Sequence, residues 1–110
     1  MGLTKSDMFS TEQNALADLC KALGHPARIA ILQQIYAKQS CICGDLVEEI
    51  GLAQATISQH LRELRKMDII QGTIDGPRVC YCINTERLGV IQEMLSAFLS
   101  LAPQSSKLCC

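Results

Sequence analysis

The cysteines of this chain are the residues whose type and spacing best suit metal binding or redox chemistry. Seven occur in 110 residues, at Cys20, Cys41, Cys43, Cys80, Cys82, Cys109 and Cys110. The first residues lack the apolar core of a secretion signal, so we expect a cytoplasmic protein whose thiols stay reduced. An odd number of cysteines also argues against a fully paired disulfide framework. The pattern predicts thiols that bind a metal or sense oxidants.

Size and composition limit what can position these thiols. The length of 110 residues suits a single domain. It is 48% hydrophobic but only 4% aromatic, with no Trp, which favours an aliphatic, mainly helical core over a β-sandwich. No apolar run of about 18 residues exists, so no membrane span is expected. With a net charge of −1, any surface that binds DNA must be locally basic.

Apolar periodicity along the chain changes from helical to strand spacing and back. It predicts helices over 11–23, 26–37, 44–50, 54–67 and 86–101, a brief strand at 41–43, and a hairpin of strands 69–74 and 79–83. Ser10 or Thr11 is expected to cap the first helix, Pro26 to begin the second, and Asn84 or Thr85 to cap the last. Gly24 is expected to end the first helix in a left-handed conformation.

This order, α-α-(β)-α-α-β-β-α, predicts a mainly α fold with a β-hairpin wing, the winged helix-turn-helix. The domain spans 10–102, between a mobile segment at 1–9 and a cysteine-bearing tail at 103–110. Tyr36 and Phe98 are expected in the core, and Cys20 is expected there as a small hydrophobe.

The predicted helix 54–67 suits the DNA major groove, so we call it the recognition helix. Ile57, Leu61 and Leu64 form its buried stripe. The opposite face and its flanks carry hydrogen-bonding and basic groups, and the hairpin tip adds one more: Gln54, Ala55, Thr56, Ser58, Gln59, His60, Arg62, Lys66 and Arg78. A merely solvated face is the alternative, but the neighbouring turn and hairpin favour binding to double-stranded DNA.

Two segments resemble the ArsR/SmtB repressors, and the likeness extends over about residues 11–101. They are LGHPARIAIL at 23–32 and GLAQATISQHLREL at 51–64. The resemblance implies a homodimer joined through the first and last helices, which represses transcription and leaves a near-palindromic operator when a metal, metalloid or oxidant binds. It implies no enzymatic activity. Ala53 stands where the family usually has a Ser or Thr helix cap, so the start of the recognition helix lacks that cap.

Arsenic- and cadmium-sensing members of this family carry a Cys-x-Cys pair near the position of Cys41 and Cys43, which lie one residue earlier here. Thiolates suit As(III), Sb(III) or another thiophilic metal as inducer, and no further cofactor is required. A third cysteine on the same helix would fall near Val47 and is absent. In a winged helix the short strand pairs with the last hairpin strand, so Cys80 and Cys82 are the favoured further ligands. The tail cysteines, Cys109 and Cys110, are the rival source.

Three other interpretations stay open. The cysteine pairs could form a disulfide or polysulfide link in a redox- or sulfide-sensing repressor. They could bind zinc in an interaction domain that has no DNA contacts. A thiol enzyme is disfavoured because the chain has no Cys-x-x-Cys motif.

Overall fold

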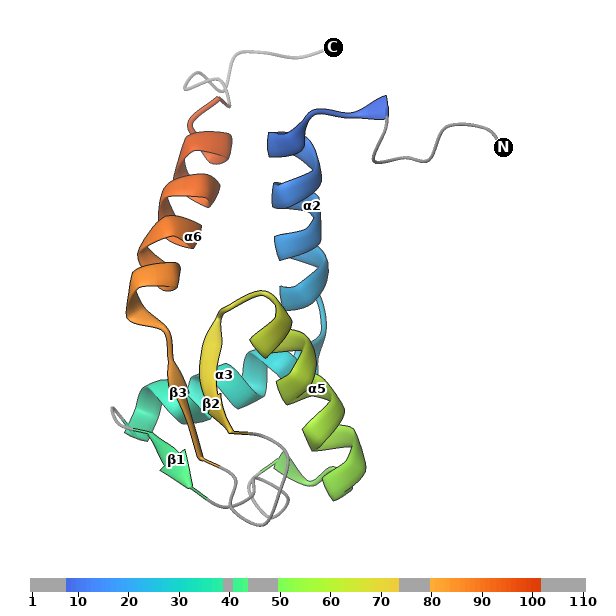
Figure 1. The fold of residues 1–110 in the computed structure, drawn as a ribbon, viewed down its shortest axis with the longest axis vertical. Helices are drawn as coiled ribbons and strands as arrows, with labels where there is room; N and C mark the ends of the chain where they lie inside the picture. Colours follow the sequence, from blue (N-terminus) through green and yellow to red (C-terminus); the bar gives the residue numbers. More distant parts are fainter. Residues whose placement is uncertain (1–7, 39–40, 44–49, 74–79, 102–110) are drawn as a thin grey trace, which may run out of the picture.

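The computed structural model describes residues 8–38, 41–43, 50–73 and 80–101. Its helices and strands follow the predicted order (Figure 1). In chain order they are α2 (Thr11–Leu23), α3 (Pro26–Lys38), β1 (Ile42–Cys43), α5 (Gln54–Lys66), β2 (Ile70–Thr73), β3 (Cys80–Ile83) and α6 (Thr85–Leu99). The predicted helix at 44–50, the hairpin tip and the tail cysteines lie outside the described residues, apart from Ile50.

Helix starts follow the local chemistry of their first residues. Ser10 caps α2 in a capping box: its Oγ accepts from the N–H of Gln13 at 3.1 Å, and the Gln13 side chain accepts from the Ser10 N–H at 2.9 Å. Pro26 begins α3 as predicted. Asn84 caps α6, because its side chain accepts from the N–H of Arg87. Gly24 ends α2 as predicted, but the predicted left-handed conformation is wrong: its φ is −82°, and its N–H donates to the Lys21 carbonyl.

The described strands form an antiparallel sheet of order β1-β3-β2, with β3 in the middle. Ile42 faces Tyr81 and Cys43 faces Cys80 in the β1–β3 register. Strands β2 and β3 pair from Ile70↔Ile83 to Thr73↔Cys80, which confirms the predicted hairpin pairing. The predicted pairing of the short strand with the last hairpin strand is also confirmed.

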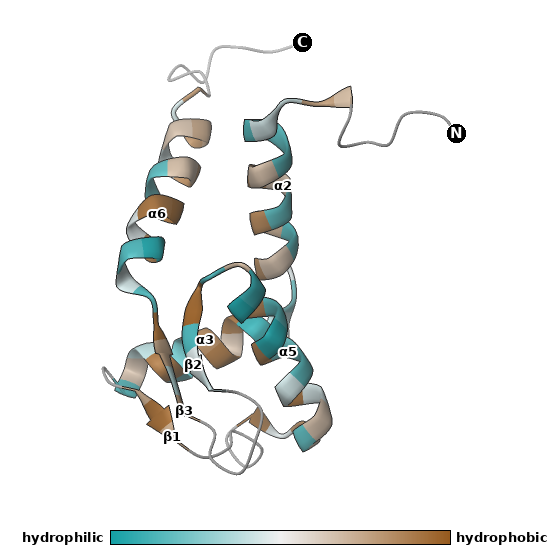
Figure 2. Cartoon of the chain, viewed as in Figure 1, coloured by the Kyte–Doolittle hydropathy of each residue, from teal (hydrophilic) through white to brown (hydrophobic). Residues whose placement is uncertain are grey.

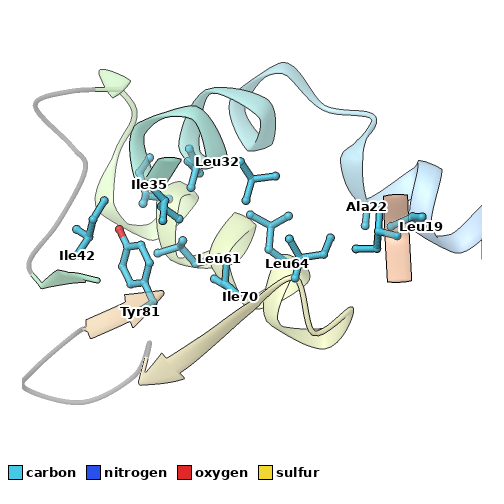
Figure 3. Close-up of a cluster of buried hydrophobic side chains, with 13 residues drawn as sticks. Leu19, Ala22, Leu32, Ile35, Ile42, Leu61, Leu64, Ile70 and Tyr81 are labelled. Carbon is cyan, nitrogen blue, oxygen red and sulfur yellow. The ribbon is translucent and has the colours of Figure 1, made fainter. Parts of the chain in front are cut away.

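The core is aliphatic and lies where α2, α3, α5 and the sheet converge (Figure 3). The stripe Ile57, Leu61 and Leu64 of α5 is fully buried, as predicted. Tyr81 is fully buried beside Ile42, and it is the one aromatic side chain of the chain that the core encloses.

Three side chains expected in the core lie at the surface instead. Tyr36 is 45% exposed and Phe98 55% exposed. Tyr36 falls near the end of α3, and Phe98 falls on the part of α6 that extends beyond the core (Figure 1). Cys20 is also exposed, because its neighbour Leu19 occupies the buried face of α2. The predictions for these three residues were wrong.

Helices α2 and α6 extend side by side away from the sheet (Figure 1). Apolar side chains stay exposed on the outer half of α6, where Figure 2 shows pale brown turns. They include Phe98 and Leu99, and Leu101 just after the helix is exposed as well. Within the described ranges, no helix is both long enough and apolar enough to cross a membrane.

Candidate DNA-binding surface and cysteine cluster

Helix α5 presents the polar face that the sequence predicts. Its buried stripe packs on the core, and Figure 2 shows the rest of this helix mostly in hydrophilic colours. The side chains predicted to bind DNA that lie exposed on it are Gln54, Ala55, Thr56, Gln59, Arg62 and Lys66, with Ser58 half-buried. That these side chains contact DNA stays a prediction. Arg78, at the predicted hairpin tip, lies outside the described residues.

The first turn of α5 is open to an anion. Ala53 is the N-cap and makes no side-chain capping bond, and the first turn carries no acidic residue. Gly51 just before it has a φ of +85°, which favours glycine and sets the tight turn into the helix. Unsatisfied N–H groups and the positive end of the helix dipole suit a phosphate oxygen.

We expect Ala53→Thr to stabilise the protein, because a threonine hydroxyl can accept from an N–H of the first turn. The expected gain in unfolding free energy is up to about 1 kcal/mol relative to Ala53→Val, which has the same shape without the hydroxyl. Urea unfolding of the two variants measures the difference. Equal midpoints would show that the turn gains nothing from a side-chain cap.

Basic side chains connect α5 to strand β2 of the wing and make the C-terminal end of α5 positively charged. The Arg65 Nη1 donates to the Gly72 carbonyl of β2 at 3.3 Å. Lys66 pairs with Glu63 at 3.2 Å across an exposed helix face, which contributes little to stability. Arg62, Arg65 and Lys66 outnumber Glu63, so the local charge of α5 is positive although the chain's is not.

His60 faces the interior, contrary to the prediction that it flanks the DNA-facing surface. It is 8% exposed, and its Nδ1 accepts from the Arg28 Nε at 3.1 Å. The physical reason is its position three residues after Ile57 and four before Leu64, which places it on the buried stripe. That spacing is the sequence signal that could have indicated the burial of His60.

Arg28, His25 and His60 make contacts that connect the helices α2, α3 and α5. The Arg28 Nη1 donates to the Ala22 carbonyl near the end of α2 at 3.0 Å, while its Nε reaches His60 on α5. His25 caps α3, since its Nδ1 accepts from the Ala27 N–H at 3.1 Å. The ring centres of His25 and His60 lie 4.4 Å apart. We call Arg28, His25 and His60 the three-helix clamp.

The clamp should make stability depend on pH. Burial lowers the pKa of His60 below its usual 6.5, the charges of His25 and Arg28 lower it further, and Glu63 opposes them. The folded state therefore favours neutral His60. The contribution of His60 to the free energy of unfolding is fully present above pH about 6.5, where the histidine of the unfolded chain is also neutral. This contribution is lost as the pH falls through the lowered pKa of the folded state.

We predict that His60→Asn removes part of this pH dependence, because asparagine can still accept from Arg28 but does not titrate. Urea unfolding of both proteins at pH 7.5 and 5.5 measures it. The wild type should lose more stability on acidification than the variant. Equal losses would mean that His60 does not titrate as the geometry requires.

The four cysteines of the two Cys-x-Cys pairs lie together on one face of the sheet. Cys41 is bonded to Cys82, and Cys43 is bonded to Cys80, in two disulfides between β3 and the segment that contains β1. Their Cα atoms lie 4.3 and 4.1 Å apart, close to the spacing of non-hydrogen-bonded residues that face each other in antiparallel strands. We call Cys41, Cys43, Cys80 and Cys82 the cysteine cluster.

Strand alternation explains the cluster. Ile42 and Tyr81 point into the core, so the residues on either side of each must point the other way. Cys41 and Cys43 are exposed and Cys80 and Cys82 half-buried. The structure therefore differs from the expectation of reduced thiols, because the register brings each cysteine directly opposite another. Among the described cysteines, Cys20 is the free one.

A metal site at this cluster requires the disulfides to be reduced. Across the described ranges, no group of three or more His, Cys, Asp or Glu side chains is placed to hold a metal ion. Reduction would free four thiols within one small area of the sheet. Soft sulfur donors in that number fit a thiophilic ion and fit magnesium or calcium poorly.

Comparison with known proteins assigns the family. Residues 25–71 match the family described as bacterial regulatory protein, arsR family. The arsenical resistance operon repressor of Staphylococcus xylosus is 30% identical over 73% of this chain and 76% of its own length. The chain belongs to the arsR family. The HTH-type transcriptional regulator YgaV of Escherichia coli is also similar, 29% identical over 81% of this chain and 90% of its own length.

The structural comparison agrees with the sequence comparison. The crystal structure of Rv0081 from Mycobacterium tuberculosis superposes with a TM-score of 0.59 at 30% identity, over 84% of this chain and 96% of that one. The arsR-family chain is therefore a winged helix transcriptional regulator that binds DNA, and not an enzyme.

Proposed function

We propose that this arsR-family protein is a homodimeric repressor that leaves its operator when a trivalent arsenical or antimonial binds the cysteine cluster. The observation that carries the proposal is the position of four cysteines, in two facing pairs, on one face of the sheet. Similarity to an arsenical resistance operon repressor supports arsenic as the inducer. Another thiophilic metal would use the same donors.

DNA binding is assigned to the exposed face of α5. Gln54, Ser58 and Gln59 carry groups that hydrogen-bond to base edges, and Arg62 and Lys66 are suited to phosphates. Ala55 and Thr56 lie at the start of the helix, where the backbone can approach closely. Gln54 already donates to Ser58 at 3.1 Å, so contact with a base would replace that bond.

A short structural path links the cluster to α5. Cys80 and Cys82 belong to β3, which pairs with β2 along its length. The Gly72 carbonyl of β2 accepts from Arg65 of α5. Drawing the sulfurs of β1 and β3 around an arsenic atom would shift β3, and this contact would pass the shift to the recognition helix.

Dimerisation is assigned to α2 and α6. A groove between these helices is almost entirely apolar, and its lining comprises Thr11, Glu12, Ala15, Leu16, Met94, Ala97, Phe98 and Leu101. A second copy would cover it, together with the exposed Phe98 and Leu101. Sedimentation at micromolar concentration should give a dimer, and a monomer that binds a single half-site would contradict the assignment.

The test is release of DNA by arsenite. The fluorescence anisotropy of a labelled promoter duplex reports binding by reduced protein, and arsenite is then titrated into the complex. We expect release to be complete near one equivalent per subunit. Full anisotropy at a large excess of arsenite and antimonite would contradict the proposed inducer.

A redox switch at the same cluster is the second candidate, and the two disulfides favour it. Each dithiol would lose two electrons and two protons to a peroxide, which is reduced to water or to water and an alcohol. Oxidation would then fix β1 against β3. Peroxide should change operator affinity and a thiol reductant should restore it. Equal affinity of the oxidised and reduced proteins would exclude this trigger.

A further inference from the structure

An apolar cavity lies beside the Cys41–Cys82 pair. Its volume is about 360 Å³, and it is formed where the end of α3, the sheet and the start of α6 meet. The lining residues are Ile35, Tyr36, Cys41, Cys82, Ile83, Thr85 and Leu88. Cys43 and Cys80 do not line this cavity, although the two pairs share one face of the sheet.

We propose that the reduced Cys41–Cys82 pair binds trivalent arsenicals that carry an aryl-sized organic group, and that the cavity holds this group. The inference rests on the proposed function, which it deepens by naming the class of inducer. Binding of such an arsenical requires two thiols that can reach one arsenic atom, and an apolar space next to these thiols.

The pair meets the first requirement. An organic arsenical, R–As(OH)₂, has two exchangeable hydroxyl groups. Reaction with two thiols breaks two S–H and two As–O bonds, forms two As–S bonds and releases two water molecules. Arsenic stays trivalent throughout, so no oxidant or reductant takes part. The Cα atoms of Cys41 and Cys82 lie 4.3 Å apart, so both sulfurs can bind one atom.

The cavity meets the second requirement. The organic group stays attached through its As–C bond and must lie next to the two sulfurs. Ile35, Ile83 and Leu88 offer it an apolar surface, and Tyr36 offers a ring face. An apolar cavity of about 150 Å³ is enough to hold benzene, so this one has room for a phenyl group. Transfer of the ring out of water favours binding, whereas a methyl group gains much less.

The experiment compares two arsenicals that differ only in the organic group. Phenylarsine oxide and methylarsine oxide are titrated into the reduced protein–duplex complex, and anisotropy reports the release of DNA. We expect the phenyl compound to act at a concentration at least about tenfold lower than the methyl compound. In the Cys41→Ser/Cys82→Ser protein this preference should fall to about twofold or less.

The other cysteine pair supplies the matched control. The Cys43→Ser/Cys80→Ser protein should keep the aryl preference, because it keeps both the cavity and the pair beside it. Leu88→Phe, which narrows the cavity and leaves every cysteine in place, should reduce the preference, and it serves as the test should the Cys41→Ser/Cys82→Ser protein not fold.

The two proposals fail in distinguishable ways. Equal potency of phenyl and methyl compounds on the wild type would overturn the aryl site and leave the proposed function standing. So would an aryl preference that survives in both the Cys41→Ser/Cys82→Ser and the Leu88→Phe proteins. Failure of both organic arsenicals and of arsenite to release DNA would overturn the proposed function together with the aryl site.

Discussion

Replacing Cys80 and Cys82 together with serine is expected to abolish the release of DNA by arsenite. The variant keeps only Cys41 and Cys43 at the cluster, and two thiolates leave the third position of a pyramidal As(III) without a sulfur ligand. Operator affinity of the reduced protein should stay within about twofold of wild type, because such substitutions off the DNA-facing helix shift free energies by about 0.5 kcal/mol or less. Anisotropy measured with and without arsenite gives both quantities.

Cys20→Ser is the control for this result. Cys20 is exposed on α2 and is free, so its variant should respond to arsenite as the wild type does. If the Cys80→Ser/Cys82→Ser protein still released DNA at one equivalent of arsenite, the ligands would lie elsewhere. The tail cysteines, Cys109 and Cys110, would then be the first to replace.

Gly72→Ala is expected to cause the largest loss of stability among single substitutions at the wing. Gly72 has a φ of +129°, which side chains rarely adopt, and an added Cβ would overlap the Cys80 carbonyl oxygen and lie 2.8 Å from the Tyr81 Cα. Backbone strain of this kind costs about 1–3 kcal/mol, and the displaced strand adds to it. Urea unfolding should therefore show a loss of at least about 2 kcal/mol.

Gly89→Ala is the matched control, since it adds the same methyl group where nothing lies within 4 Å. Gly89 is in α6, so alanine there should raise stability by about 0.5–1 kcal/mol. Gly72→Ala should also lower the yield of the Cys43–Cys80 disulfide, because Cys80 faces Thr73 next to the disturbed position. Similar stabilities of the two alanine variants would contradict the close approach of β2 and β3.

Local chemistry explains what the sequence predicts correctly. The Ser10–Gln13 capping box, Pro26 at the start of α3 and Asn84 before α6 act within a few residues, so the sequence alone indicates them. The stripe of α5 follows from helical periodicity. The approach of Cys80 and Cys82 to the first cysteine pair followed from the strand order of the winged helix together with alternation along each strand.

Errors arose where tertiary position outweighs residue type. Tyr36 and Phe98 are aromatic, but they lie on helix segments that leave the core. Cys20 differs from Leu19 by one residue and therefore by about 100° around α2. The polar character of His60 predicts a position beside DNA, yet Arg28, from a different helix, provides the partner that allows its burial. No pattern within α5 alone could reveal Arg28 as that partner.

If chemistry at the cysteine cluster controls operator binding, the state of the four sulfurs should set the affinity for DNA. The measurement is the operator affinity of one preparation in three states: oxidised with both disulfides formed, fully reduced, and reduced with one equivalent of arsenite per subunit. We expect tight, salt-dependent binding by the reduced protein and loss of at least about 90% of the bound duplex after arsenite, which corresponds to a change of more than tenfold in affinity. The same affinity in all three states would contradict it.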